Sequence, residues 1–215
     1  MRLNLPTIEA TLRRVQREFD GIQRALGSPR DPMSEPVVDN VVAGYARLDT
    51  LLAEGTDVLA MGNLKHLLEL NTMVLCGTSA ERRAAYAAHV AATERRFYDD
   101  RDAGIEDLME WYALHADEPV WMRAAGVYVR VLATPQLFIE GNHRTGALMM
   151  SYVLARHGQP PFVLSIDNAV AYFKVSASIR EIVKGTPATF FRNLAPRRRL
   201  AELLAGHADR RHLLP

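Results

Sequence analysis

Between positions 8 and 26, apolar residues recur at alternating spacings of four and three, which places them on one face of an α-helix. The stripe consists of Ile8, Leu12, Val15, Phe19, Ile22 and Leu26. It predicts a helix that begins after Thr7 and ends at Gly27, because glycine commonly closes a helix. Either the rest of the domain or a second copy of the chain has to cover this stripe, and the second outcome would make the protein a homodimer.

The helical period continues through most of the chain, and glycine and proline residues interrupt it. Further helices are expected at 37–55, 57–75, 78–98, 105–116, 120–133, 144–155, 169–183 and 187–204. Thr78 and Glu81 have the spacing of a capping box at a helix start. In the helix at 105–116 the expected buried side is Leu108, Trp111 and Leu114. With no convincing pair of strands, the class is all-α.

Residues 147–155 are apolar nearly all round, which is typical of a helix at the centre of a domain. We expect residues 1–36 to form an N-terminal helix and loop. Residues 37–215 would then form the main helical domain around that central helix.

The composition of the chain excludes some classes of partner and compartment. The 26 Lys and Arg residues against 25 Asp and Glu residues leave a formal charge of +1, so we expect no nucleic acid partner. The single cysteine, Cys76, lies in an apolar run and is expected to be a buried structural thiol in a reducing compartment. The start of the chain does not have the apolar core of a signal peptide, and no apolar run has transmembrane length. We therefore expect a cytoplasmic protein with no membrane partner.

The segment 137–146 lies between two apolar helical runs and is typical of a phosphate-binding loop. Gly141 and Gly146 permit unusual backbone angles, and Asn142 can adopt a left-handed conformation, so successive N–H groups could face one anion. The helix expected from about Arg144 would add its free N–H groups. Glu140 is the kind of oxygen ligand that Mg²⁺ prefers, and the Arg144 guanidinium suits phosphate oxygens. The alternative is a glycine-containing turn whose charged side chains face water.

These residues resemble the motif of the Fic (Fido) family, H-x-F-x-[D/E]-G-N-G-R-x-x-R. The match runs from Phe138 to Arg144, followed by an apolar helix and then by Gly158 and Pro160-Pro161. Residues 50–55 also resemble the [S/T]-x-x-x-E-[G/N] pattern of an inhibitory helix, here expected at 45–55 with Glu54 as its glutamate. The resemblance extends over roughly residues 48–182.

Fic proteins typically transfer AMP from ATP to a hydroxyl side chain of a target protein, with Mg²⁺ as cofactor. The resemblance implies that Glu140 holds the metal and that Phe138 anchors the loop in the core. Asn142 and the loop amides would hold the inner phosphates, and Arg144 the outer ones. Thr145 and Gly146 complete the expected nucleotide loop.

The chain departs from this motif at three positions. Gln136 stands where the family has its histidine base, and a carboxamide has no usable basicity near neutral pH. His143 replaces the second glycine, and Ala147 replaces the second arginine. That arginine is the usual partner of the inhibitory glutamate, so Glu54 would either turn to Arg144 or remain an exposed helix-end residue. The turn at 99–104 also has no room for the family's target-binding hairpin.

Three function classes follow. The first is a transferase of the nucleotidyl type with altered chemistry, in which His143 either replaces the missing base or only forms hydrogen bonds at the mouth of the loop. The second is a catalytically silent protein that binds a nucleotide, another phosphate compound or a regulatory partner. The third is a structural or dimerising protein whose loop binds nothing.

Overall fold

The structure is a computed structural model that describes residues 1–27, 29–99, 104–184 and 194–214. Its helices are α1 (Leu5–Leu26), α2 (Glu35–Ala53), α3 (Lys65–Cys76), α4 (Ala80–Ala85), α5 (Ala87–Asp99), α6 (Ile105–Leu114), α7 (Val120–Leu132), α8 (Asn142–Arg156), α9 (Ile166–Arg180), α11 (Leu194–Gly206) and the 3-10 helix η1 (Arg210–His212). Within those ranges no strand forms, and two isolated bridges join Leu3 to Leu213 and Thr134 to Val183. The predicted all-α class is confirmed.

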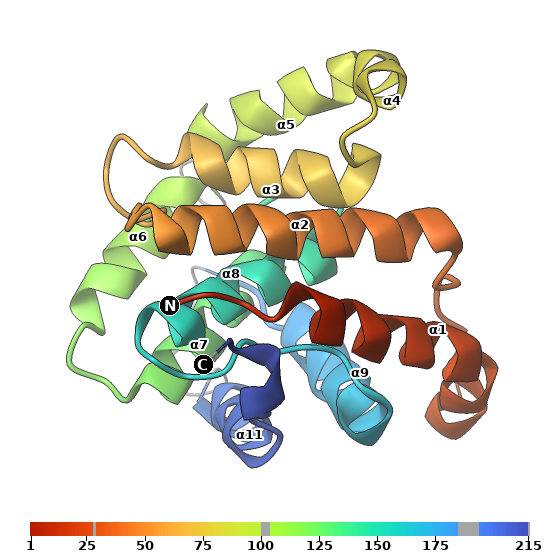
Figure 1. Cartoon of the computed structure of the whole chain (residues 1–215). Helices are drawn as coiled ribbons and strands as arrows, with labels where there is room; N and C mark the ends of the chain where they lie inside the picture. The colour runs from red at the N-terminus through yellow and green to blue at the C-terminus, as the bar shows by residue number, and fades with distance from the viewer. Residues whose placement is uncertain (28, 100–103, 185–193, 215) are drawn as a thin grey trace.

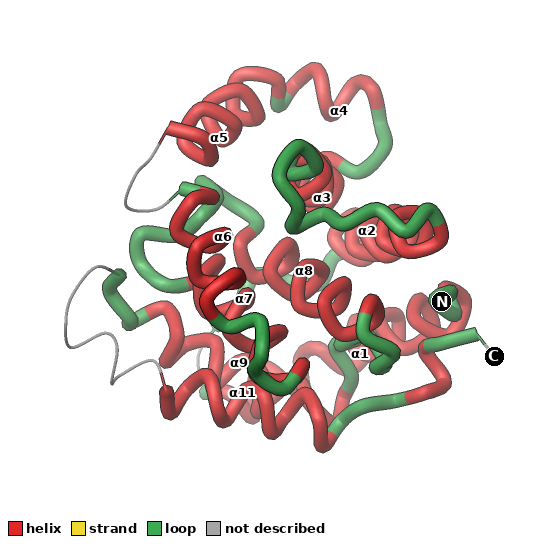
Figure 2. Tube along the Cα trace, turned by 90° about the vertical axis from the view of Figure 1, so that its left-hand side faces the viewer, coloured by secondary structure: helices red, strands yellow, loops and turns green. Residues whose placement is uncertain are grey.

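Helix α8 is the centre of the molecule. All its residues from Leu148 to Ala155 are buried, which confirms the prediction of a central helix at 147–155. It packs against α7, α3 and α2. In Figure 2 it lies in the middle of the trace, with α2 and α3 on one side and α6 and α7 on the other. The loop that leads into α8 is therefore fixed by several helices at once.

The chain covers the apolar stripe of α1 by itself. Figure 1 shows α1 below α2 and beside α9, and it contacts both helices. Phe19 meets Phe173 of α9 edge to face, with ring centroids 6.4 Å apart, and Ile8 and Leu12 belong to the main core. Because this stripe is buried within one chain, it no longer argues for a homodimer.

Two predicted helix starts in the first half of the chain are wrong. Helix α3 begins at Lys65 and not at 57, because Asp57 and Asn63 close a turn before it: the Asn63 amide donates to the Asp57 carbonyl over 2.9 Å. The cap expected at Thr78 is instead Ser79, whose hydroxyl accepts from the backbone N–H of Arg82. The helix expected over 78–98 is divided into α4 and α5 at residue 86.

Other boundaries moved by a few residues. Asn4 caps α1, which therefore begins at Leu5, and Ser165 caps α9 in a capping box with Asn168. Leu114, expected on the buried side of α6, is 75% exposed because α6 ends there. The turn expected at 99–104 and the start of the helix expected at 187 fall largely outside the described residues. No helix among the described residues is long and apolar enough to cross a membrane.

Cys76 is buried at the end of α3, as expected for a structural thiol, and burial raises its pKa. Burial outweighs the opposite effect of Arg83 and Arg82 on this pKa, which is the reverse of what a reactive thiolate needs.

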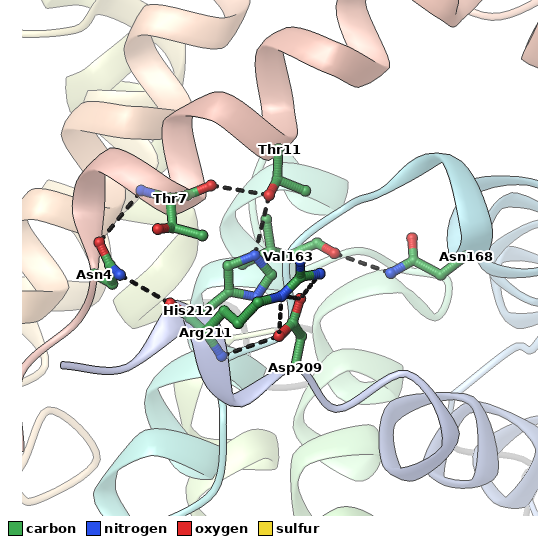
Figure 3. Close-up of polar contacts among 8 residues, drawn as sticks. All are labelled: Asn4, Thr7, Thr11, Val163, Asn168, Asp209, Arg211 and His212. Carbon is green, nitrogen blue, oxygen red and sulfur yellow. Dashed lines mark hydrogen bonds and ion pairs between the residues drawn. The ribbon is translucent and has the colours of Figure 1, made fainter. Parts of the chain in front are cut away.

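The two ends of the chain are fastened to each other. Figure 3 shows the side-chain contacts, in which the Asn4 side chain donates to the Arg211 carbonyl. The Asn4 backbone N–H also donates to the His212 carbonyl, over 2.8 Å. The Thr11 hydroxyl donates to the Thr7 carbonyl, so its oxygen accepts from Nε2 of His212 at 3.1 Å. His212 is buried, and this burial lowers its pKa. These hydrogen bonds hold α1 and η1 together.

Gly146 is a packing residue and not a loop residue. It lies inside α8 without a positive φ, and an added Cβ would lie 3.0 Å from Cδ2 of Tyr128 on α7. The prediction that Gly146 frees the loop backbone is therefore wrong, because the helix has already begun at Asn142.

Gly146→Ala is expected to lower the free energy of unfolding by about 1–3 kcal/mol, the usual cost of overpacking a close contact. Urea denaturation measures this change. The matched control is Gly21→Ala inside α1, where an added Cβ meets only the Arg24 side chain at 3.8 Å. The control should gain up to about 1 kcal/mol from helix propensity. A Gly146→Ala protein as stable as the control would contradict the close α7–α8 contact.

Candidate functional site

The loop from 134 to 141 joins α7 to α8 and is anchored by Phe138. The Phe138 side chain is fully buried and stacks on Phe97 of α5 with ring centroids 5.7 Å apart. The backbone N–H of Leu137 donates to the carbonyl of Val131 in α7 over 3.1 Å. This confirms the expected anchoring role of Phe138 and fixes the loop against α5 and α7.

Gly141 is the residue that turns the loop into α8. Its φ is +76°, a left-handed conformation that favours glycine. An added Cβ would also lie 2.9 Å from Nδ2 of Asn71, which leaves little room for a side chain. Asn142 does not share this conformation, because positive φ values among the described residues occur only at glycines. The left-handed role expected of Asn142 is thus wrong, and Gly141 alone makes the turn.

The side chain of Asn142 is used inside the protein. It accepts from the Phe138 backbone N–H over 2.9 Å, and its amide donates to the Phe138 carbonyl over 2.8 Å and to Oε1 of Gln136 over 3.1 Å. The residue is buried, with 4% of its surface exposed. Asn142 therefore shapes the loop, and its side chain has no donor left in this arrangement for a phosphate.

Asn71 of α3 closes the same turn from the other side. Its amide donates to the Glu140 carbonyl over 2.9 Å and to the Thr145 hydroxyl over 3.0 Å. Thr145 is fully buried. Like Asn142, Thr145 lies behind the loop, on the side away from solvent.

The two charged residues of the predicted loop are placed differently. Glu140 is exposed, and Arg144 donates to the carbonyl of Val74 in α3 over 2.5 Å. Burial lowers the pKa of Arg144, although the Asp31 and Glu140 carboxylates oppose this shift. Arg144 is thus tied to α3 and is not a free phosphate ligand on the loop surface.

The described residues do not build a magnesium site around Glu140. Across those ranges, no three His, Cys, Asp or Glu side chains come together in a way that could hold a metal ion. Glu140 also does not line the open cleft described below. Magnesium therefore stays an expectation from the resemblance.

Gln136, at the position of the family's histidine, is held on both sides. Its side-chain oxygen accepts from Asn142, and its backbone carbonyl accepts from Nη2 of Arg96 over 2.6 Å. Its own amide donates weakly to the Leu132 carbonyl at 3.4 Å. These bonds give Gln136 a structural use at the edge of the loop.

His143 sits at the end of a chain of buried hydroxyl groups. Tyr172 donates to the His143 carbonyl at 3.4 Å, and Tyr128 donates to the Tyr172 oxygen at 2.8 Å. The Tyr128 oxygen can then only accept from Nδ1 of His143, which lies 3.0 Å away. This network assigns the hydrogen to Nδ1 and leaves Nε2 as the nitrogen with a lone pair. Nε2 is buried and has no hydrogen-bond partner.

The surroundings of His143 keep its imidazole neutral. Burial lowers the pKa of His143 to about 4, and the cations Arg180, Arg30 and Arg144 act in the same direction. A histidine in this state is a much weaker base at neutral pH than an exposed one. Sequence reasoning left two roles open, and the contacts favour a hydrogen-bonding role.

Glu54 is not near the loop. It caps the end of α2 and accepts from the Thr56 hydroxyl at 3.5 Å, while the Thr56 carbonyl accepts from the Tyr152 hydroxyl in α8 at 2.5 Å. Tyr152 and Arg144 are eight residues apart in α8, or about 12 Å along the axis. Of the two expected placements of Glu54, the structure therefore shows the exposed helix-end residue and not the partner of Arg144.

Sequence reasoning missed an open cleft of about 660 Å³ in front of the loop. Arg30 from the α1–α2 connection, Arg96 from α5 and Arg180 from the end of α9 all line it, together with Gln136 and one carboxylate, Glu181. The Nε atoms of Arg30 and Arg96 are buried without a partner. Three guanidinium groups converging on one cleft provide the donors that an anion needs.

The fold and the cleft define a class: an all-α protein with an arginine-lined cleft beside the loop that leads into its central helix. No family profile matches the sequence, and no curated protein is similar to it. Among solved structures, the chain is similar to a Fic domain containing signaling protein from Bacteroides thetaiotaomicron. The identity is 16%, the match covers 94% of this chain and 89% of that chain, and the TM-score is 0.47. This is the family that the motif resembles. A likeness this weak carries no activity, ligand or partner over to this chain.

The burial of His143 predicts a pH dependence of stability. Its folded pKa of about 4 lies below the ordinary value of 6.5, so the unfolded chain binds a proton where the folded chain does not. This contribution to stability is complete above about pH 6.5 and is lost as the pH falls towards 4. In His143→Phe, the free energy of unfolding should therefore fall less steeply between pH 6.5 and 4.5 than in the wild type.

Urea denaturation at several pH values measures the slope. The buried His212 acts in the same direction in both proteins, so the difference between them isolates His143. His207→Gln, which changes an exposed histidine next to α11, is the control and should keep the wild-type slope. Equal slopes for His143→Phe and the wild type would contradict the buried, neutral imidazole.

Proposed function

We propose that this protein binds a phosphate-containing small molecule in the open cleft in front of the loop, and that it acts as a sensor or regulator. The observation that carries the proposal is the convergence of Arg30, Arg96 and Arg180 on that cleft. Planar guanidinium groups bind phosphate oxygens through paired, charge-assisted hydrogen bonds. Nucleotides are included among the ligands that such a cleft could take.

The three arginine side chains of the cleft differ in how far contacts within the protein already order them. Arg30 donates to the Phe173 carbonyl over 3.3 Å and lies over the Phe173 ring, 5.4 Å from its centroid. Arg96 is held by the Gln136 carbonyl. Because these contacts already order two of the side chains, binding an anion costs little further side-chain entropy. Arg180 is exposed and completes the set from the third side.

A binding role is favoured over AMP transfer because the family's histidine base is missing from the cleft. Among its described lining residues there is no histidine, and Gln136 occupies the position of the family's base. His143 lines a separate cavity behind the loop, and its Nδ1 is bonded to Tyr128. General-base catalysis accounts for about 10²–10⁴-fold of the rate in enzymes that use it. A transferase with this cleft would have to use the carboxylate of Glu181 as its base or work without that contribution.

The first test is calorimetric titration with inorganic phosphate, pyrophosphate, ADP and ATP, each with and without Mg²⁺. Arg180→Ala should weaken the binding of the phosphate compounds about tenfold, because one charge-assisted contact is lost. Lys174→Ala removes another exposed cation from α9, outside the cleft, and should leave the affinity near that of the wild type.

Two results would contradict the proposal. One is the absence of binding of every one of these compounds to the wild-type protein. The other is an equal loss of affinity in Arg180→Ala and Lys174→Ala, because general attraction to a positive surface would then explain the binding.

A further inference from the structure

A second cavity, of about 260 Å³, lies behind the loop between α1, α2, α8 and α9. Its walls are mostly apolar and include Phe19 of α1, Val41 of α2, Ala147 and Leu148 of α8, and Phe173 of α9. A dry, apolar cavity of about 150 Å³ is known to hold a benzene molecule. The space here is therefore large enough for a compact ring or a short branched chain.

The hydroxyl groups in the cavity wall are already used by the protein. Tyr45 donates to the Phe162 carbonyl, and Tyr172 donates to the His143 carbonyl. The His143 ring is neutral and is bonded through Nδ1 to Tyr128. A group that enters the cavity thus meets mostly apolar surface, and the unpartnered Nε2 of His143 is an acceptor, which favours an uncharged occupant over an anion.

The cavity and the open cleft share two residues, Arg30 and Arg180. Arg30 lies over the Phe173 ring, so its guanidinium group stands at the border between the two spaces. The cleft side has Arg96 and the carboxylate of Glu181 in addition, and the cavity side has Arg144 and the carboxylate of Asp31. Charge alone therefore does not distinguish the two spaces. The apolar walls of the cavity favour an uncharged group there and leave the anionic group to the more polar cleft, and Arg144 is already bonded to the Val74 carbonyl.

We infer that the ligand is an organic phosphate whose apolar group, a single aromatic ring or a short branched chain, fills the cavity between α1, α2, α8 and α9 while its phosphate lies on the arginines of the cleft. The inference rests on the proposed function, since it places the phosphate in the same cleft. It goes further because it names the class of ligand. It also assigns a role in ligand selection to Ala147, whose small side chain leaves room for the ring in the cavity.

The test compares phenyl phosphate, methyl phosphate and inorganic phosphate by calorimetric titration. Burial of the ring should make phenyl phosphate bind at least tenfold tighter than methyl phosphate to the wild-type protein. Ala147→Leu fills the cavity and should remove this advantage while inorganic phosphate binds as before. Ala177→Leu is the matched control, because Ala177 is also half-buried but lines only the open cleft, and it should keep the advantage of the ring.

Thermal unfolding provides a readout that needs no ligand. If Ala147→Leu fills an existing cavity, the melting temperature should stay unchanged or rise, whereas overpacking of a filled site would lower it. Should Ala147→Leu fail to fold, the space is already filled and the inference is overturned. The comparison of the three phosphate compounds needs only the wild-type protein, so it tests the inference even if no variant can be prepared.

The outcomes separate the two claims. If inorganic phosphate binds and phenyl phosphate gains nothing over methyl phosphate, the inference is overturned and the proposed function stands. If none of the three compounds binds, the proposed function fails and the inference fails with it. If both leucine variants lose the advantage of the ring equally, the ring lies in the open cleft, which also overturns the inference.

Discussion

Helix α8 is buried on nearly every side, so the polar groups where it begins must be satisfied inside the protein. The side chain of Asn142 closes the loop onto Phe138 and Gln136, and Asn71 of α3 bonds the Glu140 carbonyl and Thr145. These bonds fix both the turn and the position of α8 against α3. The side chains that face inward at this turn therefore serve the fold before they can serve a ligand.

This constraint also explains where ligand-binding groups remain. Arg144 is drawn towards α3 by the Val74 carbonyl, and His143 is held by Tyr128 in a buried, neutral form. The positive groups left facing a cleft come from other elements, namely Arg30, Arg96 and Arg180. The chemistry of the site thus belongs to the surroundings of the loop more than to the loop itself.

The sequence predicted what depends on local pattern: the all-α class, the positions of most helices, the buried stripe of α1, the central helix and the anchoring Phe138. It could not predict the partners of Thr145 and Arg144, because Asn71 and Val74 lie about seventy residues earlier in the chain. The cleft was missed for the same reason. Arg30, Arg96 and Arg180 carry no motif and come together only through the packing of α5, α9 and the α1–α2 connection. Glu54 matched a short pattern, yet the direction of α2 places it beside the far end of α8.

The most direct measurement follows the arginine Nε–H signals by nuclear magnetic resonance while inorganic phosphate is added to the ¹⁵N-labelled protein. If the anion binds in the cleft, the signals of Arg30, Arg96 and Arg180 shift together with one dissociation constant, and the signal of Arg95, next to Arg96 but outside the cleft, does not. Unchanged signals of all three arginines, with shifts confined to the backbone amides of residues 142–144, would place the anion at the start of α8 and contradict the central claim.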